Sequence, residues 1–189
     1  MEIDNEITVL VKTDYDALQK ELYEKDFKIE EEYLVNDVYM LDERVDISNM
    51  NYLDILKNCI LVRDIVGFEK QLLYKHKKYD NNGDILEQGK VKCPIEDINK
   101  AIKFMEAIQY KKIFTISDNC IVYKNNKNKL AIELVNDKYI CIGMESNEND
   151  NKNIDELKQD LLSYNLPIDK TNFFVKKAQI ELKEVLEND

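Results

Sequence analysis

Single charged side chains end or interrupt several apolar stretches of the sequence, and their chemistry could define a site. The cations in such positions are Lys12, Arg63 and Lys75, and the carboxylates include Glu133 and Glu145. Arg63 ends the apolar run 59–62 and, in a strand, would point away from the face that carries Val62. A guanidinium facing the inside of a fold needs an anionic partner, because an unpaired buried charge is costly. The pattern therefore marks Arg63 as the strongest candidate for an anion-binding side chain.

The alternation of charged and apolar residues has two interpretations. Lys12 and Lys75 could be solvated lysines on the outer face of an ordinary barrel, and Glu133 could simply pair with a lysine. Alternatively, the charged faces line a polar lumen, and the apolar faces point outward beneath helices. The predicted helices need an apolar surface to cover, and a barrel has only two surfaces. This requirement favours the polar lumen.

An α+β arrangement of short elements is expected to position these residues. Alternating patterns predict strands over 6–12, 27–41, 59–66, 68–79, 85–93, 112–117, 120–125, 130–135 and 139–145. Capping residues and apolar stripes predict helices over 15–25, 94–108, 154–164 and 171–186, with a helical or irregular connection over 48–57. The segment Asn81-Asn82-Gly83-Asp84 is the clearest turn signal. We therefore expect a mostly antiparallel β-barrel of about eight strands with helices packed outside, in one domain spanning residues 1–189.

Composition excludes several classes of site and partner. His76 is the only histidine, and the four cysteines form no CxxC pair, which argues against zinc sites, disulfides and histidine-based triads. A net charge of -11 disfavours nucleic acid and anionic membranes as partners. The acidic start resembles no signal peptide, and no apolar run approaches the ~20 residues of a membrane span. These features predict a cytoplasmic protein with buried thiols.

Short segments spread over almost the whole chain carry a family resemblance. They are residues 6–12 (EITVLVK), 37–40 (DVYM), 59–63 (CILVR), 73–75 (LYK) and 130–145. In this order they resemble the ExExK, D-x-Y-F, A-L-R-I-R, T-Y-K and closing L-D-x-V and E-I-E strands of the CYTH, or triphosphate-tunnel, superfamily. That superfamily includes class IV adenylyl cyclases, thiamine triphosphatases and inorganic tripolyphosphatases, so the chain resembles a divergent member.

The resemblance implies a site for a triphosphate, which would be a nucleotide, thiamine triphosphate or inorganic tripolyphosphate. Lys12, Arg63 and Lys75 would bind its phosphates. Glu6, Glu133 and Glu145 are the candidate ligands of Mg²⁺ or Mn²⁺. For a metal-assisted reaction at least two carboxylates must converge, which requires Glu6 and Glu145 to meet.

Two functions follow from this resemblance. The first is metal-dependent hydrolysis or cyclisation of the triphosphate, with the catalytic acid or base unassigned. The second is a catalytically reduced tunnel that senses a phosphorylated ligand or binds a protein. Family glutamates are replaced by Thr8, Leu10 and Gly143, and a family arginine by Leu61. These replacements count against efficient turnover and keep the second function open.

Overall fold

The computed structural model describes residues 5–79, 85–146 and 152–188, and places eight strands and five helices among them. The strands are β1 (Glu6–Leu10), β2 (Lys28–Asp42), β3 (Ile60–Ile65), β4 (Glu69–Tyr79), β5 (Ile85–Pro94), β6 (Tyr110–Lys124), β7 (Lys129–Val135) and β8 (Tyr139–Glu145). The helices are α1 (Tyr15–Glu24), α2 (Tyr52–Lys57), α3 (Ile98–Ala107), α4 (Ile154–Ser163) and α5 (Lys177–Asn188). The predicted turn at 81–84 lies outside the described residues. No helix in the described ranges combines the length and the apolar character that crossing a membrane requires.

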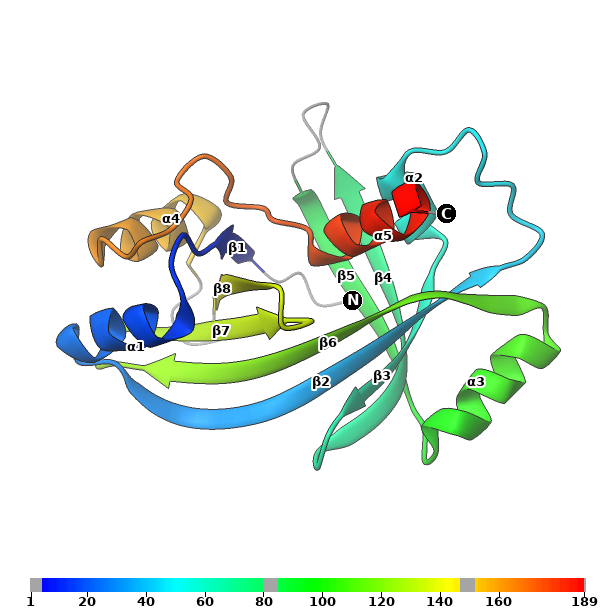
Figure 1. The fold of residues 1–189 in the computed structure, drawn as a ribbon, viewed down its shortest axis with the longest axis horizontal. Helices are drawn as coiled ribbons and strands as arrows, with labels where there is room; N and C mark the ends of the chain where they lie inside the picture. Colours follow the sequence, from blue (N-terminus) through cyan, green and yellow to red (C-terminus); the bar gives the residue numbers. More distant parts are fainter. Residues whose placement is uncertain (1–4, 80–84, 147–151, 189) are drawn as a thin grey trace. The chain divides into compact units, whose positions relative to one another are not determined.

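The strands form one sheet in the order β1-β8-β7-β6-β2-β3-β4-β5 (Figure 1). The six pairings with a described register are antiparallel, so the expected α+β class with eight antiparallel strands is confirmed. The expected closure into a barrel is not seen in the pairing of the described residues. The free side of β1 is instead hydrogen-bonded to a C-terminal segment: Thr8 N–H donates to Phe173 O at 2.9 Å, and Val175 N–H donates to Thr8 O at 3.0 Å.

Two elements differ from the sequence-based expectation. The two strands expected over 112–117 and 120–125 are one continuous strand, because Asp118 and Asn119 pair with Val135 and Leu134 in the β6–β7 ladder. The last helix begins at Lys177 rather than near Thr171. Before it, residues 167–175 run beside β1, so the strand's backbone groups on that side are satisfied.

The described chain divides into two compact units, each made of separate segments. Unit 1 contains residues 34–117 and 176–188, and unit 2 contains residues 5–33 and 118–175 outside the gap at 147–151. The long strands β2 and β6 each contribute residues to both units. The single domain over 1–189 remains a prediction.

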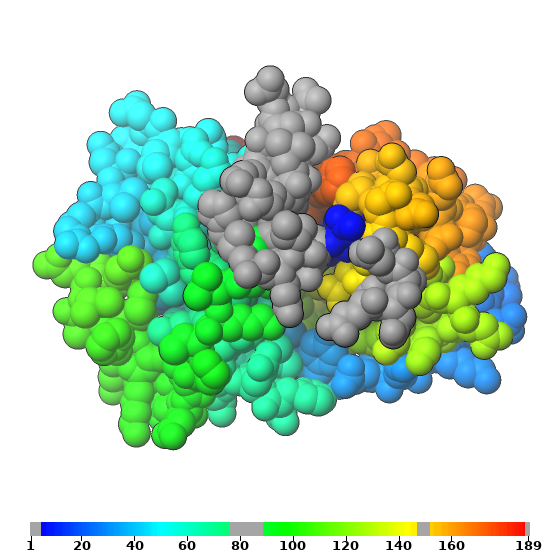
Figure 2. Space-filling view, turned by 180° about the vertical axis from the view of Figure 1, so that it is seen from behind, coloured from blue at the N-terminus to red at the C-terminus, as the bar shows by residue number. Residues whose placement is uncertain are grey.

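In unit 1, one face of the sheet packs under α3. Met40 and Val62 are fully buried there, and Met105 of α3 is 2% exposed. The helix α3 is part of the green surface in Figure 2, and its Phe104 is largely exposed. Helices α2 and α5 lie on the other side of this part of the sheet (Figure 1). Side chains alternate along β3, so Arg63 points to the face opposite the one that carries Val62, as the sequence predicted.

Unit 2 has its own apolar core on one face of β1, β8 and β7. Ile7 and Val9 of β1 are fully buried against Leu22 of α1 and Leu161 of α4. Both helices begin with side-chain caps: the Asp14 carboxylate accepts from Ala17 N–H, and Asn153 forms a capping box with Glu156. In β1, β8 and β7 the apolar face is therefore the one that packs against helices, and the opposite face carries Glu6, Glu133 and Glu145.

Candidate functional site

A largely buried ion pair in unit 1 joins Arg63 to Asp37. The two residues are register partners across β2 and β3, and Arg63 Nε and Nη2 each donate to a carboxylate oxygen at 2.6 Å. Asp37 is 4% exposed and the Arg63 side chain 20% exposed. The anionic partner that an inward-facing Arg63 requires is therefore present within the chain itself. A planar guanidinium matches a carboxylate in this paired geometry, so the contact fixes the orientation of Arg63.

The pKa of Asp37 depends on the charges that surround its carboxylate. Burial opposes its ionisation, yet the Arg63 hydrogen bonds and charge, helped by Lys75 and Lys177, hold the pKa of Asp37 below its usual value. The carboxylate is therefore ionised at neutral pH. Lys75 on β4 and Lys177 at the start of α5 both lie close enough to influence it.

Arg63 and Lys75 point to the same face of the sheet. Arg63 is opposite Gln71 on β4, and Lys75 lies four residues further along that strand. Because side chains alternate with a period of two, Gln71 and Lys75 share a face with Arg63. Leu61 and Leu73 lie on this face as well, and they are as buried as Gln71, which is 3% exposed, so the face is mixed in character and enclosed at its centre. The predicted placement of Arg63 with Lys75 on one face is thus seen in the register.

An aromatic pair lies beside these charges. Tyr39 and Phe114 stack with ring centroids 4.3 Å apart and an interplanar angle of 14°. Burial raises the pKa of Tyr39, and the nearby Asp37 charge raises it further, against the opposing effect of Arg63. The phenol therefore stays protonated at neutral pH and can donate a hydrogen bond, but it is not a base.

Lys12, the third predicted phosphate ligand, belongs to unit 2. It lies just beyond β1, its side chain is 61% exposed, and its Nζ is 3.5 Å from Asp169 Oδ1. The pKa of Asp169 is lowered by hydrogen bonds from Thr171 and, to a smaller extent, by Lys12. Convergence of Lys12 with Arg63 and Lys75 stays a prediction.

Two of the three predicted metal ligands are neighbours. Glu6 and Glu145 are register partners across β1 and β8, so they project to the same face of unit 2. Glu133 is on the same face but opposite Cys141, four residues along β8 from Glu145 and about 13 Å away by strand rise. Within the described ranges, no three His, Cys, Asp or Glu side chains are grouped closely enough to hold a metal. Among the described residues, a metal bound beside Glu6 and Glu145 would therefore have these two carboxylates as ligands.

Thr8 and Gly143, two of the positions where the resembled motifs carry glutamates, form the next row of the same face. Thr8 is opposite Gly143, and Gly143 is opposite Ala131. A Cβ added to Gly143 would meet the Ala131 Cβ at 3.7 Å and its carbonyl oxygen at 3.8 Å, which is ordinary contact. The backbone of this row would thus accept a side chain at residue 143.

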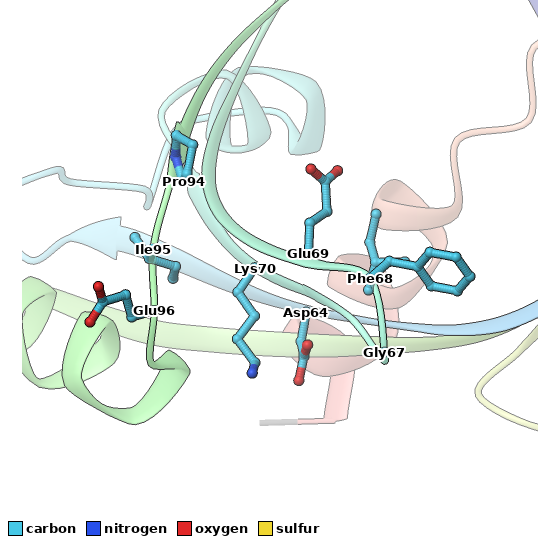
Figure 3. Close-up of a pocket in the computed structure, with 9 residues that line it drawn as sticks. Asp64, Gly67, Phe68, Glu69, Lys70, Pro94, Ile95 and Glu96 are labelled. Carbon is cyan, nitrogen blue, oxygen red and sulfur yellow. The ribbon is translucent and has the colours of Figure 1, made fainter.

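A separate hollow of about 500 Å³ lies in unit 1 beside the β3–β4 turn and the start of α3 (Figure 3). Its lining residues include the carboxylates of Asp64, Glu69 and Glu96 and one cation, Lys70. In Figure 3, Asp64 and Lys70 point to one side of the strands and Glu69 to the other. Three carboxylates to one lysine do not suit an anion, so this hollow is not a phosphate site.

No family model matches the sequence, and no curated protein matches it. The structure is similar to several solved ones. A candidate adenylate cyclase from Vibrio parahaemolyticus aligns with a TM-score of 0.64 at 11% identity, covering 98% of each chain. HpAC1 from Hippeastrum, a candidate adenylyl cyclase with a dominant triphosphatase activity, aligns with a TM-score of 0.53 at 12% identity over 90% of this chain and 91% of its own.

A third similar structure is not described as a cyclase. A chain of the Schizosaccharomyces pombe Mediator head module aligns with a TM-score of 0.57 at 8% identity, over 88% of this chain and 98% of its own. At such identities the likeness concerns the fold and not the activity. The comparisons therefore show the fold alone: the chain has the fold of these solved structures, two of which are candidate adenylyl cyclases.

Proposed function

We propose that the protein binds a triphosphate, either a nucleotide, thiamine triphosphate or inorganic tripolyphosphate, through Arg63 and Lys75, with Lys12 as a further ligand. The observation that carries the proposal is the enclosed face of unit 1 to which Arg63 and Lys75 both project, in a chain with 11 more acidic than basic residues. Cations in a water-poor setting bind phosphate oxygens strongly, and a guanidinium held in place by Asp37 loses little freedom on binding.

Metal-dependent hydrolysis or cyclisation is the finer part of the proposal. Glu6 and Glu145 would hold Mg²⁺ or Mn²⁺, because Mg²⁺ typically takes one or two carboxylates and completes its coordination with water and phosphate oxygens. Such a metal would neutralise phosphate charge and lower the pKa of a bound water or hydroxyl. Glu133 would then act at a distance from the pair, through the field of its carboxylate.

The test is calorimetric titration with tripolyphosphate, ATP and thiamine triphosphate, with and without Mg²⁺, followed by measurement of phosphate release. Removing Arg63 alone would strand the buried Asp37 charge, so the informative variant is Arg63→Met with Asp37→Leu. The matched control is Arg44→Met with Asp42→Leu, an ion pair in which the Arg44 side chain is 68% exposed. We expect binding in the wild type and the control, and at least a tenfold loss in the Arg63 variant.

Glu145→Gln tests the metal separately. It should leave metal-free tripolyphosphate binding unchanged and remove the effect of Mg²⁺ on binding and on phosphate release. Absence of binding by all three ligands at millimolar concentration would overturn the proposal. Fast phosphate release without added metal would overturn its metal-dependent part.

The second candidate function is a tunnel-fold module that binds a protein. Two observations favour it: Asp37 and Asp169 already contact Arg63 and Lys12, and the fold recurs in a chain of the Mediator head module. In that case none of the triphosphates would bind in the calorimetric titration. The two functions are therefore separated by the same titration.

A further inference from the structure

The outward side of α3 carries apolar residues that the core does not use. The inward side packs on the sheet through four apolar residues, Ile98, Ala101, Ile102 and Met105. Phe104 is 60% exposed and Ile108 is 45% exposed, although residues of these types are usually buried. Ile108 N–H donates to Phe104 O at 3.2 Å, so the two residues lie one helical turn apart and their side chains are neighbours. They form an apolar pair on the surface of unit 1.

Four exposed lysines surround this apolar pair. Lys100 and Lys103 lie on the exposed side of α3, within one turn of the first member of the pair. Lys111 and Lys112 follow near the start of β6. Only two residues separate Lys111 from the second member of the pair, which limits the distance between their Cα atoms to about 11 Å. Positive charge therefore lies at both ends of the pair.

The charge of this surface is opposite to that of the whole chain. Residues 98–112 contain four lysines and one acidic residue, Glu106, in a chain with a net charge of -11. Within the described ranges, none of these four ammonium groups forms an ion pair with a carboxylate, whereas Lys25 and Lys57 pair with Glu21 and Asp54 on their own helices. A local positive field on a negative protein attracts an acidic partner and orients it.

The composition of the surface favours a protein over nucleic acid or lipid as its partner. Four lysines would attract nucleic acid or an anionic membrane, but the net charge of the whole chain repels both. Phe104 and Ile108 are spaced like the apolar side chains of a partner helix, which recur at every third or fourth residue. A partner helix with carboxylates before and after its apolar residues therefore matches this surface in both shape and charge.

We propose that this part of unit 1 docks an acidic amphipathic segment of another protein. The docking site, which we call the α3 surface, consists of Phe104, Ile108, Lys100, Lys103, Lys111 and Lys112. The apolar side chains of the segment pack on the apolar pair, and its carboxylates pair with the lysines. The α3 surface lies on the side of the sheet opposite to Arg63, so the inference does not depend on the triphosphate site. It gives the second candidate function a surface and a partner of defined chemistry.

The probe is a synthetic peptide of about 15 residues with Leu and Phe on one helical face and Glu on the other. Its binding to the full-length chain is measured by fluorescence anisotropy, together with a peptide in which Gln replaces each Glu and one in which Ser replaces each Leu and Phe. The test variant is Lys103→Glu with Phe104→Ser. The matched control is Lys20→Glu with Tyr23→Ser, which makes equivalent changes at exposed positions of α1 in unit 2. The ligand-free melting temperature of both variants should stay close to that of the wild type, because the changed side chains are exposed.

The wild type and the control variant should bind the acidic amphipathic peptide equally well, and the test variant should bind it at least about tenfold more weakly. Both altered peptides should bind the wild type at least about tenfold more weakly, and the affinity for the acidic amphipathic peptide should fall as salt is added. Tripolyphosphate should bind the test variant as it binds the wild type, so a failure of this inference is distinct from a failure of the proposed function.

The inference is wrong if the wild type does not bind the acidic amphipathic peptide at millimolar concentration, or if the test variant binds it as well as the control does. Tighter binding of duplex DNA or of phosphatidylserine vesicles than of the peptide would identify a different class of partner and overturn the inference. Self-association of the chain that is lost in the test variant would overturn it as well, because the partner would then be a second copy of the chain.

Discussion

Arg63 and Asp37 face each other across the β2–β3 ladder and share two parallel hydrogen bonds of 2.6 Å in a nearly enclosed setting. A pair in this position has two effects. It orients the guanidinium, and it places a carboxylate that the proposed anion would meet at close range. Stability and the proposed ligand binding would therefore be coupled at one contact.

Asp37→Asn should destabilise the protein by about 3–5 kcal/mol, because it leaves the largely buried Arg63 charge without its counter-ion. Asp42→Asn, which breaks the exposed pair with Arg44, should cost no more than about 1 kcal/mol. Urea denaturation followed by circular dichroism measures both. Equal losses in the two variants would contradict the enclosed character of the Asp37 contact.

The Asp37–Arg63 pair should also make the protein less stable in acid. The pKa of Asp37 is lower in the folded chain than in the unfolded chain, where a value of about 3.9 is expected. The folded state therefore gains stability above that pH and loses it as the pH falls through the lower, folded pKa. The free energy of unfolding should drop below about pH 4 more steeply in the wild type than in the Asp37→Leu, Arg63→Met double variant. If the free energy of unfolding depended on pH equally in the two proteins, Asp37 would not contribute to the loss of stability in acid.

Gly143→Glu should strengthen metal binding. The backbone accepts a Cβ at this position, and the new carboxylate would lie on the same face as Glu145 and Glu6, one row along β8. A third oxygen ligand should raise the affinity for Mn²⁺ about tenfold in a titration followed by electron paramagnetic resonance. Gly143→Gln is the matched control, since it has the same length without the charge. An equal gain in the control would point to a change in packing.

Thiol reactivity should follow burial. Cys93 is exposed, whereas Cys59, Cys120 and Cys141 are buried, and burial raises the pKa of Cys59 to about 12. A disulfide reagent at pH 8 should label one thiol rapidly in the native protein and all four in denaturant. Cys93→Ser should abolish the rapid phase, and Cys120→Ser should preserve it. Rapid labelling of two or more native thiols would contradict the packing of the core.

Local alternation predicted much of the fold. It identified the strands and the face of Arg63, since a period of two is set by each strand alone. It failed at Asp118 and Asn119, whose side chains are typical of turns, because their pairing with β7 outweighs that preference. It also failed near Thr171, where the backbone pairs with β1, more than 160 positions earlier in the chain.

The candidate site was predicted only in part. The need of Arg63 for an anion was visible in the sequence, but its partner Asp37 is defined by the register of two strands. Nothing in the sequence marked Lys177, because its position depends on how α5 packs in unit 1.

The two neighbours of β1 come from the far end of the chain, and this has a consequence for synthesis. Ile7 pairs with Met144, and Thr8 is hydrogen-bonded to the backbone around Phe174. At about 5–20 residues per second, the ribosome would release β8 roughly 7–30 s after β1. During that interval the first strand has exposed edges and an apolar face, and a chain stalled before β8 is the species most in need of a chaperone.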